Sequence, residues 1–299
     1  MEETNRNFQE LLEAQWAKDK FVCVGLDSDY RTIAQNSPYS KSPNSDVRWP
    51  SIRSTVACFN SEIVKTTQDI VCAYKLNIAF YEKYGSEGLD GLRDTIKNIH
   101  AISPDVPVIL DAKYGNNENA NLSCVEAAFD YFRADAITLH PYLGKEALQP
   151  FLDCKNKGII VLCRTSNPGA GEFQDLFVDP EGTVRLYQYV ALRIAEEWNK
   201  NGNCALVVGA TYPDELRIVR EIVGDMPILI PGIGAQGGNV EKTVSAGMDS
   251  RGWGMIINSS RGIIFASDGE DFAEAARRET LKLHELICAS IKKDFLLKR

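Results

Sequence analysis

The chain has 299 residues, of which 44% are hydrophobic and 25% are charged, and its formal net charge is -8 at pH 7. These proportions indicate a globular chain long enough for one large domain or two ordinary ones. The acidic balance argues against a general nucleic-acid binder, which would need a basic face, but a local pocket can still be positive enough for a phosphorylated small molecule.

The cysteines and the hydropathy pattern lead us to expect a cytoplasmic protein. Eight cysteines are scattered along the chain without a CxxC pair, which is typical of free thiols in a reducing compartment. No run of 18 apolar residues is present, and residues 1–6 lack the pattern of a signal peptide. We therefore expect no contact with a membrane.

Short apolar runs rich in β-branched residues alternate with stretches of helical length. Residues 1–20 are predicted as an N-terminal helix, residues 31–50 as a polar insertion after the first strand, and residues 271–293 as a closing helix. The predicted strands are 21–26, 70–76, 106–110, 134–139, 158–163, 204–208, 227–230 and 254–257. The predicted helices between them include 51–67, 88–99, 124–133, 184–199, 213–223 and 239–246.

Strands of this kind, alternating with helices, predict an α/β protein whose parallel sheet is covered on both faces. Eight units fit a (β/α)8 barrel of the TIM type better than an open doubly wound sheet, which would carry a glycine fingerprint after its first strand. Here the first predicted strand leads into Gly25, Leu26 and Asp27, which do not form that fingerprint. We expect residues 1–299 to form one barrel domain, with the N-terminal helix across its bottom.

An acid and a base stand two residues apart where the third predicted strand ends. Asp111 and Lys113 follow the apolar run 106–110. On a strand, positions i and i+2 point to the same face, so the two side chains would lie side by side. Strand exits are where barrel enzymes keep their chemistry, although a simple ion pair remains the alternative interpretation.

Polar residues end the other predicted strands as well. Desolvating even one unpaired charge costs several kcal/mol, so stability alone does not explain charges at so many exits. Lys75 stands inside an apolar run and favours a function, whereas His140 before Pro141 is more readily interpreted as structural. Besides Asp111 and Lys113, the remaining polar residues at strand exits are Asp27, Asn77, Arg164, Thr165, Ser166, Thr211, Gln236, Asn258, Ser259, Ser260 and Arg261.

Two late segments predict a phosphate site. Residues 231–239, which include Gln236 and Gly237, form a glycine-rich turn before a helix, and its backbone N–H groups can approach an anion. Residues 258–262 supply hydroxyls and the guanidinium of Arg261, which suits phosphate. Because barrels usually bind phosphate after strands seven and eight, the sequence predicts an enzyme or binder for a phosphorylated small molecule.

These residues resemble those of the orotidine 5′-monophosphate decarboxylases, specifically the longer bacterial-type branch. The matching segments follow one another from the first predicted strand to the eighth, which makes the combination specific. They are residues 24–27, 74–82, 110–113, 162–169, 208–213, 232–239 and 257–262.

The resemblance implies a homodimer of (β/α)8 barrels that converts orotidine 5′-monophosphate to uridine 5′-monophosphate and carbon dioxide in pyrimidine biosynthesis, without cofactor or metal. By position, Asp111 would face the substrate carboxylate, and Lys113 would protonate carbon 6 as carbon dioxide leaves. Lys75 and Asp27 would hold the ribose hydroxyls. The further substrate-binding residues that the resemblance implies are Asn77, Ser166 at the pyrimidine edge, and Gln236, Gly237 and Arg261 at the phosphate.

Three positions of the catalytic loop depart from the family's pattern Asp-x-Lys-x-x-Asp-Ile-x-x-Thr. The second Asp of that pattern is Asn116 here, the Ile is Asn117 and the Thr is Ala120. In the family these positions reach into the neighbouring subunit's site. Because Lys113 would lose a charge-assisted partner, we expect weaker decarboxylation with nucleotide binding retained.

Two alternatives to a decarboxylase stay open. One is a catalytically weak or inactive homologue on the same barrel that binds a nucleotide monophosphate. The other is a related barrel enzyme for a different phosphorylated substrate, such as a phospho-sugar acid decarboxylase or epimerase, although residues 165–168 favour a pyrimidine. A metal-dependent relative is not expected from a chain with only three histidines.

Overall fold

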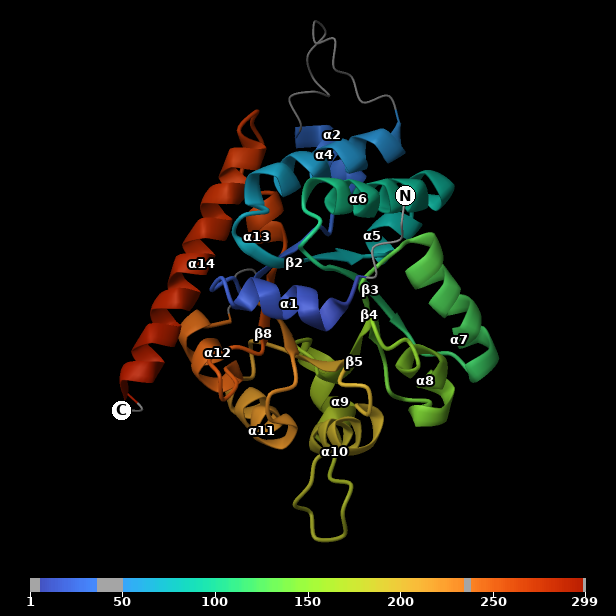
Figure 1. The fold of residues 1–299 in the computed structure, drawn as a ribbon, viewed down its shortest axis with the longest axis vertical. Coiled ribbons are helices and arrows are strands. Elements are labelled where there is room, and N and C mark those ends of the chain that lie inside the picture. Colours follow the sequence, from blue (N-terminus) through green and yellow to red (C-terminus); the bar gives the residue numbers. More distant parts are fainter. Residues whose placement is uncertain (1–5, 37–50, 234–237, 298–299) are drawn as a thin grey trace, which may run out of the picture.

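The computed structural model describes residues 6–36, 51–233 and 238–297. Eight parallel strands pair in sequence order, and β8 pairs with β1, so that the sheet closes into a barrel (Figure 1). The predicted (β/α)8 barrel is therefore confirmed. The strands are β1 (Val22–Gly25), β2 (Val71–Asn77), β3 (Val108–Tyr114), β4 (Ala136–Leu139), β5 (Gly158–Arg164), β6 (Cys204–Val208), β7 (Ile228–Pro231) and β8 (Met255–Ser259).

Helices surround the barrel, and the longer ones, such as α4, α6 and α11, bury an apolar stripe against it. In α11, for example, Leu216, Val219 and Val223 recur at helical spacing and are buried. Because helices cover the outer face of the sheet, the strands are apolar along nearly their whole length. The helices are α1 (Phe8–Trp16), α2 (Tyr30–Asn36), α4 (Ile52–Thr67), α5 (Ala79–Glu82), α6 (Gly85–Ile102), α7 (Glu118–Val125), η1 (Glu126–Tyr131), α8 (Gly144–Leu152), η2 (Pro168–Ala170), α9 (Gly171–Gln174), α10 (Leu186–Arg193), η3 (Ile194–Trp198), α11 (Pro213–Val223), α12 (Val240–Gly247), α13 (Arg261–Ile264) and α14 (Phe272–Leu297).

Several predicted boundaries differ from the observed ones. The segment expected as an insertion, 31–50, begins with helix α2, and its residues 37–50 lie outside the described residues. The helix expected at 124–133 starts earlier, because the Asn117 side chain accepts a hydrogen bond from the Ala120 N–H at 3.1 Å and caps α7. It then continues as the π-helix η1. The closing helix α14 extends four residues beyond the expected end.

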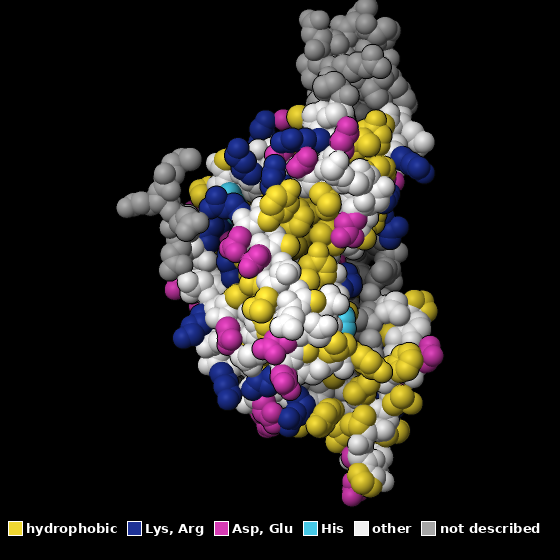
Figure 2. All heavy atoms as spheres, turned by 90° about the vertical axis from the view of Figure 1, so that its right-hand side faces the viewer, with side chains coloured by type: hydrophobic (Ala, Val, Ile, Leu, Met, Phe, Trp, Pro, Cys, Tyr) yellow, Lys and Arg dark blue, Asp and Glu magenta, His cyan; other side chains and the backbone are white. Residues whose placement is uncertain are grey.

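The side of the barrel covered by α7 and α8 carries exposed hydrophobic side chains (Figure 2). Leu122, Tyr131, Tyr142 and Leu143 are among the exposed ones near these two helices. Further exposed apolar residues, Phe173 and Leu176 among them, belong to the segment that follows β5. A contiguous exposed apolar surface commonly marks a place of contact with another molecule.

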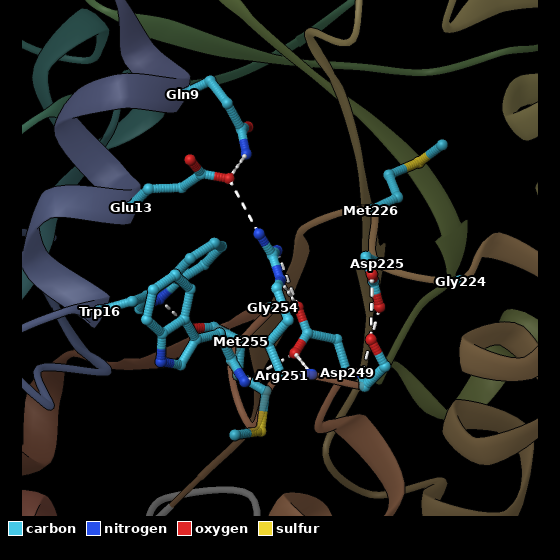
Figure 3. A network of polar contacts seen from close by, with 12 residues as sticks. Gln9, Glu13, Trp16, Gly224, Asp225, Met226, Asp249, Arg251, Gly254 and Met255 are labelled. Carbon is cyan, nitrogen blue, oxygen red and sulfur yellow. Dashed lines mark hydrogen bonds and ion pairs between the residues drawn. The ribbon is translucent and has the colours of Figure 1, made fainter.

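Helix α1 closes the bottom of the barrel. Its Trp16 donates a hydrogen bond from Nε1 to the Met255 carbonyl at 2.9 Å, at the start of β8. Its Phe8 packs against Gly158 at the start of β5, where a Cβ would approach the ring to 2.3 Å. Figure 3 shows Glu13 of α1 and Arg251 pointing toward one another, joined at 3.2 Å. Because α1 occupies the amino-terminal ends of the strands, the opposite end is free for a site.

Candidate active site

A cavity of about 540 Å³ opens at the carboxyl ends of the strands. A smaller hollow of about 380 Å³ lies at the other end of the barrel, beside Gln15 and Val106, and contains none of the predicted site residues. The predicted site residues that line the larger cavity are Asp27, Lys75, Asn77, Asp111, Lys113, Ser166 and Arg261. The structure therefore brings residues from five strand exits together in one cavity.

Lys75 of β2 is buried between two carboxylates. It is only 4% exposed, and its Nζ lies 3.1 Å from Asp111 Oδ2 and 3.4 Å from Asp27 Oδ1. Burial alone would lower the pKa of Lys75, but the negative charges of Asp111 and Asp27 outweigh it and raise the pKa above its ordinary value. The ammonium is therefore firmly charged and orders both carboxylates.

Asp111 lies between two lysines. Its Oδ1 accepts hydrogen bonds from Lys113 Nζ at 2.6 Å and from Thr138 Oγ1 at 2.8 Å. Burial would raise the pKa of Asp111, but the charges of Lys75 and Lys113 overcome it and hold the pKa well below its usual range. Asp27, Lys75, Asp111 and Lys113 thus form a row of alternating charges.

Lys113 reaches Asp111 by a kink rather than by the regular alternation expected of a strand. Its backbone has a φ of +52°, which is uncommon for a residue with a side chain. The register between β3 and β4 shifts between Leu110 and Tyr114, and the Lys113 N–H donates to Thr138 Oγ1 at 3.0 Å. The Lys113 side chain remains 46% exposed, so its ammonium is accessible from the cavity.

Thr138 is a site residue that the sequence analysis missed. It lies inside the apolar strand β4, one residue before the strand ends. Its hydroxyl donates a hydrogen bond to Asp111 and accepts one from the Lys113 N–H. His140, which was noted at that exit, packs over Gly115 instead, and a Cβ on Gly115 would come within 2.5 Å of its Nε2. The interpretation of His140 as structural agrees with this packing.

The end of the cavity near β7 and β8 offers groups for an anion. Gly232 and Arg261 line it, and Gly232 has a φ of +105°, a backbone conformation that favours glycine. The buried Ser260 Oγ, also from a cavity-lining residue, has no hydrogen-bond partner among the described residues, and its hydroxyl can donate to an anion. Gln236 and Gly237, predicted for the phosphate, lie outside the described residues.

Asn116 does not line the cavity with the other predicted residues. Its side chain is exposed, and its backbone is held by the fully buried side chain of Asn121. Asn121 accepts from the Asn116 N–H at 3.0 Å and donates to the Asn116 carbonyl at 2.7 Å. Asn121 also donates to the Ala147 carbonyl of α8 at 2.6 Å, so position 116 is fixed to the helices beside the cavity.

Within residues 6–36, 51–233 and 238–297, no three His, Cys, Asp or Glu side chains are grouped so that they could hold a metal ion. None of the helices in those ranges is both long enough and apolar enough to span a bilayer.

The sequence profile of the orotidine 5′-phosphate decarboxylase / HUMPS family matches residues 20–276, which contain all eight strands. The chain belongs to this family. Every cavity-lining residue named above lies inside the match to the orotidine 5′-phosphate decarboxylase / HUMPS family.

Individual relatives are similar over nearly the whole chain. The identity to orotidine 5′-phosphate decarboxylase of Aromatoleum aromaticum is 45% over 283 residues, covering 94% of this chain and 98% of that protein. The identity to orotidine 5′-phosphate decarboxylase of Cupriavidus metallidurans is 46% over 281 residues, covering 94% and 97%. The solved structure of Leishmania donovani OMP decarboxylase is similar with a TM-score of 0.76 at 34% identity, covering 93% and 99%.

Proposed function

We propose that the chain decarboxylates orotidine 5′-phosphate to uridine 5′-monophosphate and carbon dioxide in de novo pyrimidine biosynthesis, without a cofactor. The observation that carries the proposal is the alternating row of Asp27, Lys75, Asp111 and Lys113 in the same cavity as Arg261. The identity of 42–46% to bacterial enzymes supports placing the chain in the longer bacterial-type branch.

The proposed chemistry uses the two charges at the exposed end of the row. Loss of carbon dioxide leaves carbanion character at carbon 6, which has no electron sink of its own. The Lys113 ammonium, fixed by Asp111 at 2.6 Å, stabilises that charge and then delivers a proton to carbon 6. Asp111 faces the leaving carboxylate, while the buried Lys75 keeps Asp111 ionised.

Substrate binding is assigned to residues that line the cavity and to two that lie outside the described residues, Gln236 and Gly237. Asp27 and Lys75 hold the ribose hydroxyls, with Asn77 beside them, and Ser166 faces the pyrimidine edge. Arg261 holds the phosphate together with Gln236 and Gly237. Phosphate binding far from carbon 6 can supply energy for alignment of the reacting centre.

A homodimer and a weakened reaction belong to the same proposal. Asn116 is fixed by Asn121 at the rim, and its exposed side chain is available to a neighbouring subunit. The exposed hydrophobic residues over α7 and α8 lie on the side where such a contact would form (Figure 2). Because Asn116 is an amide rather than an acid, the Lys113 ammonium in the active site that Asn116 reaches receives less charge compensation. Turnover therefore falls, while nucleotide binding persists.

Location and domain organisation complete the proposal. All eight cysteines are free thiols, which supports a cytoplasmic location. The described strands form one closed barrel, which supports a single domain over residues 1–299.

The ultraviolet absorbance of orotidine 5′-phosphate tests the proposal. Its loss in the presence of the purified chain is the expected result, followed by saturable binding of uridine 5′-monophosphate in a titration. Binding without turnover would instead support the inactive nucleotide-binding homologue. Neither turnover nor binding would point to another phosphorylated substrate.

A further inference from the structure

The segment after β5 forms one wall of the cavity. We call residues 165–167, that is Thr165, Ser166 and Asn167, the lip; all three line the cavity, and so does Gln174 at the end of α9. The hydrogen bonds among these residues have a fixed direction. That direction follows from which groups can only donate and which can only accept.

Arg164 sets the orientation of the Gln174 carboxamide. Arg164 is 2% exposed, and its guanidinium lies 3.9 Å from the centre of the Tyr212 ring and pairs with Asp175 at 3.1 Å. Its Nη1 donates to Gln174 Oε1 at 3.4 Å, and the Thr165 N–H donates to the same oxygen at 2.9 Å. Both groups are donors only, so the oxygen of the carboxamide must face them.

The orientation of Gln174 in turn fixes the Thr165 hydroxyl. With Oε1 facing the two donors, Gln174 Nε2 donates to Thr165 Oγ1 at 2.9 Å. A hydroxyl has a single proton, and Thr165 Oγ1 has two acceptors in reach, Gln174 Oε1 at 3.3 Å and Asn167 Oδ1 at 2.6 Å. Because Gln174 Oε1 already accepts from two donors and is the more distant of the two, we assign the proton to the bond with Asn167 Oδ1. The hydrogen bonds therefore run in one direction, from Gln174 through Thr165 to Asn167. We call this chain of hydrogen bonds the relay.

The relay ends on the donor group of Asn167. The 2.6 Å separation from Thr165 Oγ1 suits an O–H···O bond to Oδ1, and turning the amide would replace that bond by an N···O contact shorter than an N–H···O bond usually is. Asn167 is exposed at the cavity, and its Nδ2 makes no hydrogen bond to the residues that the structure describes. The lip thus presents an N–H donor to whatever ring lies in the cavity.

We propose that the relay Gln174–Thr165–Asn167 makes the site select a ring carbonyl over a ring amino group. A uracil-type ring carries an acceptor oxygen at carbon 4, whereas cytosine carries an amino donor there. The hydroxyl of Ser166 can donate or accept, so it cannot make this distinction by itself. This inference rests on the proposed function, since it requires the pyrimidine to face the lip.

Binding of uridine 5′-monophosphate and cytidine 5′-monophosphate, measured by calorimetry on the full chain, tests the relay. The unsubstituted chain should bind the uridine nucleotide at least about tenfold more tightly, because the amino group of cytosine would leave two donors facing each other. Thr165→Val removes the relay hydroxyl, so Asn167 can present either end of its amide and the ratio of the two affinities should fall about tenfold. Thr165→Ser keeps the hydroxyl and should keep the ratio.

Two further variants change the direction of the relay. Gln174→Glu offers only acceptors, so the Thr165 hydroxyl turns to residue 174 and releases Asn167, and the ratio should fall as in Thr165→Val. Asn167→Asp presents an acceptor to the ring and should bind the cytidine nucleotide more tightly than the uridine nucleotide. Ribose 5-phosphate lacks the ring, so its affinity should be the same in every variant.

The outcomes separate the relay from the proposed function. Failure of the unsubstituted chain to bind uridine 5′-monophosphate would contradict the proposed function, and the relay with it. Uridine 5′-monophosphate binding with an unchanged affinity ratio in Thr165→Val, Gln174→Glu and Asn167→Asp would overturn the relay alone. If one variant no longer binds ribose 5-phosphate, it is misfolded. The ratio of the uridine to the cytidine nucleotide affinity in the other two variants then decides whether the relay holds.

Discussion

Lys113 Nζ lies 2.6 Å from Asp111 Oδ1, and Lys113 reaches this position from a backbone whose φ is +52°. A residue with a side chain adopts such a conformation at a cost of about 1–3 kcal/mol, and strain of this kind is concentrated at functional sites. The hydrogen bond from the Lys113 N–H to the Thr138 hydroxyl holds the backbone in this conformation. The acid–base pair is therefore held in place before any substrate arrives.

Thr138 is expected to be a positioning residue for that pair. Thr138→Val removes the hydroxyl that bonds Asp111 and accepts from the Lys113 N–H. We expect kcat to fall at least about tenfold, and the free energy of unfolding to fall by about 1–3 kcal/mol, because one donor loses its partner. Steady-state kinetics and urea unfolding check this, with Thr138→Ser as the control that keeps both bonds. A Thr138→Val chain with unchanged kcat would contradict the role.

Lys75→Met should destabilise the chain at neutral pH. The variant keeps the volume but leaves Asp27 and Asp111 facing each other without a cation, and removal of one partner from a buried pair typically costs about 3–5 kcal/mol. Urea unfolding measures the loss. Lys65→Met, an exposed lysine paired with Glu62, is the matched control and should change the free energy of unfolding by less than about 1 kcal/mol.

The pH dependence of the Lys75→Met effect has a definite sign. The pKa of Asp111 is depressed, so its contribution to stability is complete above the usual carboxyl range and is lost as the pH falls below about 4. The pKa of Lys75 is raised, so its contribution persists at all pH values below about 10. The stability difference between the two chains should therefore narrow on acidification below about pH 4. A difference that widens there would contradict the assigned pairing.

Asp135 should produce a separate acid-sensitive contribution at the bottom of the barrel. It is fully buried, with Arg6 Nε and Nη2 at 2.8 and 2.9 Å and the Val108 N–H at 2.9 Å. Burial would raise its pKa, but His100 and Arg6 lower it to about 2. Since the folded pKa is depressed, about 2 kcal/mol of stability should be lost between about pH 4 and pH 2.

Asp135→Asn should remove this loss of stability from the acid limb, that is, from the fall in the free energy of unfolding as the pH decreases. Urea unfolding at a series of pH values compares this variant with Asp214→Asn, which changes an exposed carboxylate. The Asp214→Asn chain should follow the unsubstituted one. An acid limb of equal steepness in Asp135→Asn would show that another group is responsible.

Asn116→Asp should raise turnover. The substitution restores an acid at the rim, where Asn121 already fixes the backbone. Losing one preorganised electrostatic group commonly costs about 10²–10³-fold in rate, so restoring it should recover part of that factor. The affinity for uridine 5′-monophosphate should change much less. A chain whose kcat does not improve on Asn116→Asp would refute the assigned role, and Asn119→Asp, which adds the same charge nearby, controls for a general charge effect.

The sequence was sufficient to predict the barrel and most of the cavity. Apolar strands alternating with helices are a strong pattern, and polar residues at strand exits must converge once the strands are parallel and closed. Lys75, Asp111 and Arg261 were predicted for this reason, and they meet in one cavity.

Residues outside that pattern were missed for physical reasons. Thr138 stands within an apolar strand, and only the pairing of β4 with β3 shows that it faces Asp111. Gln174 follows the strand exit by ten residues in chain order, without a periodic signal, and reaches the lip only through the turn made by η2 and α9. The kink at Lys113 could not be predicted either, because local alternation favours a regular strand there.

The central claim is that Lys113 protonates the product of decarboxylation, and the rate of orotidine 5′-phosphate loss in Lys113→Ala tests it most directly. The unsubstituted chain should consume the substrate and form uridine 5′-monophosphate. Lys113→Ala should do so at least about 10²–10³-fold more slowly while it still binds uridine 5′-monophosphate. Equal rates in the two chains, or no consumption by the unsubstituted chain, would contradict the account.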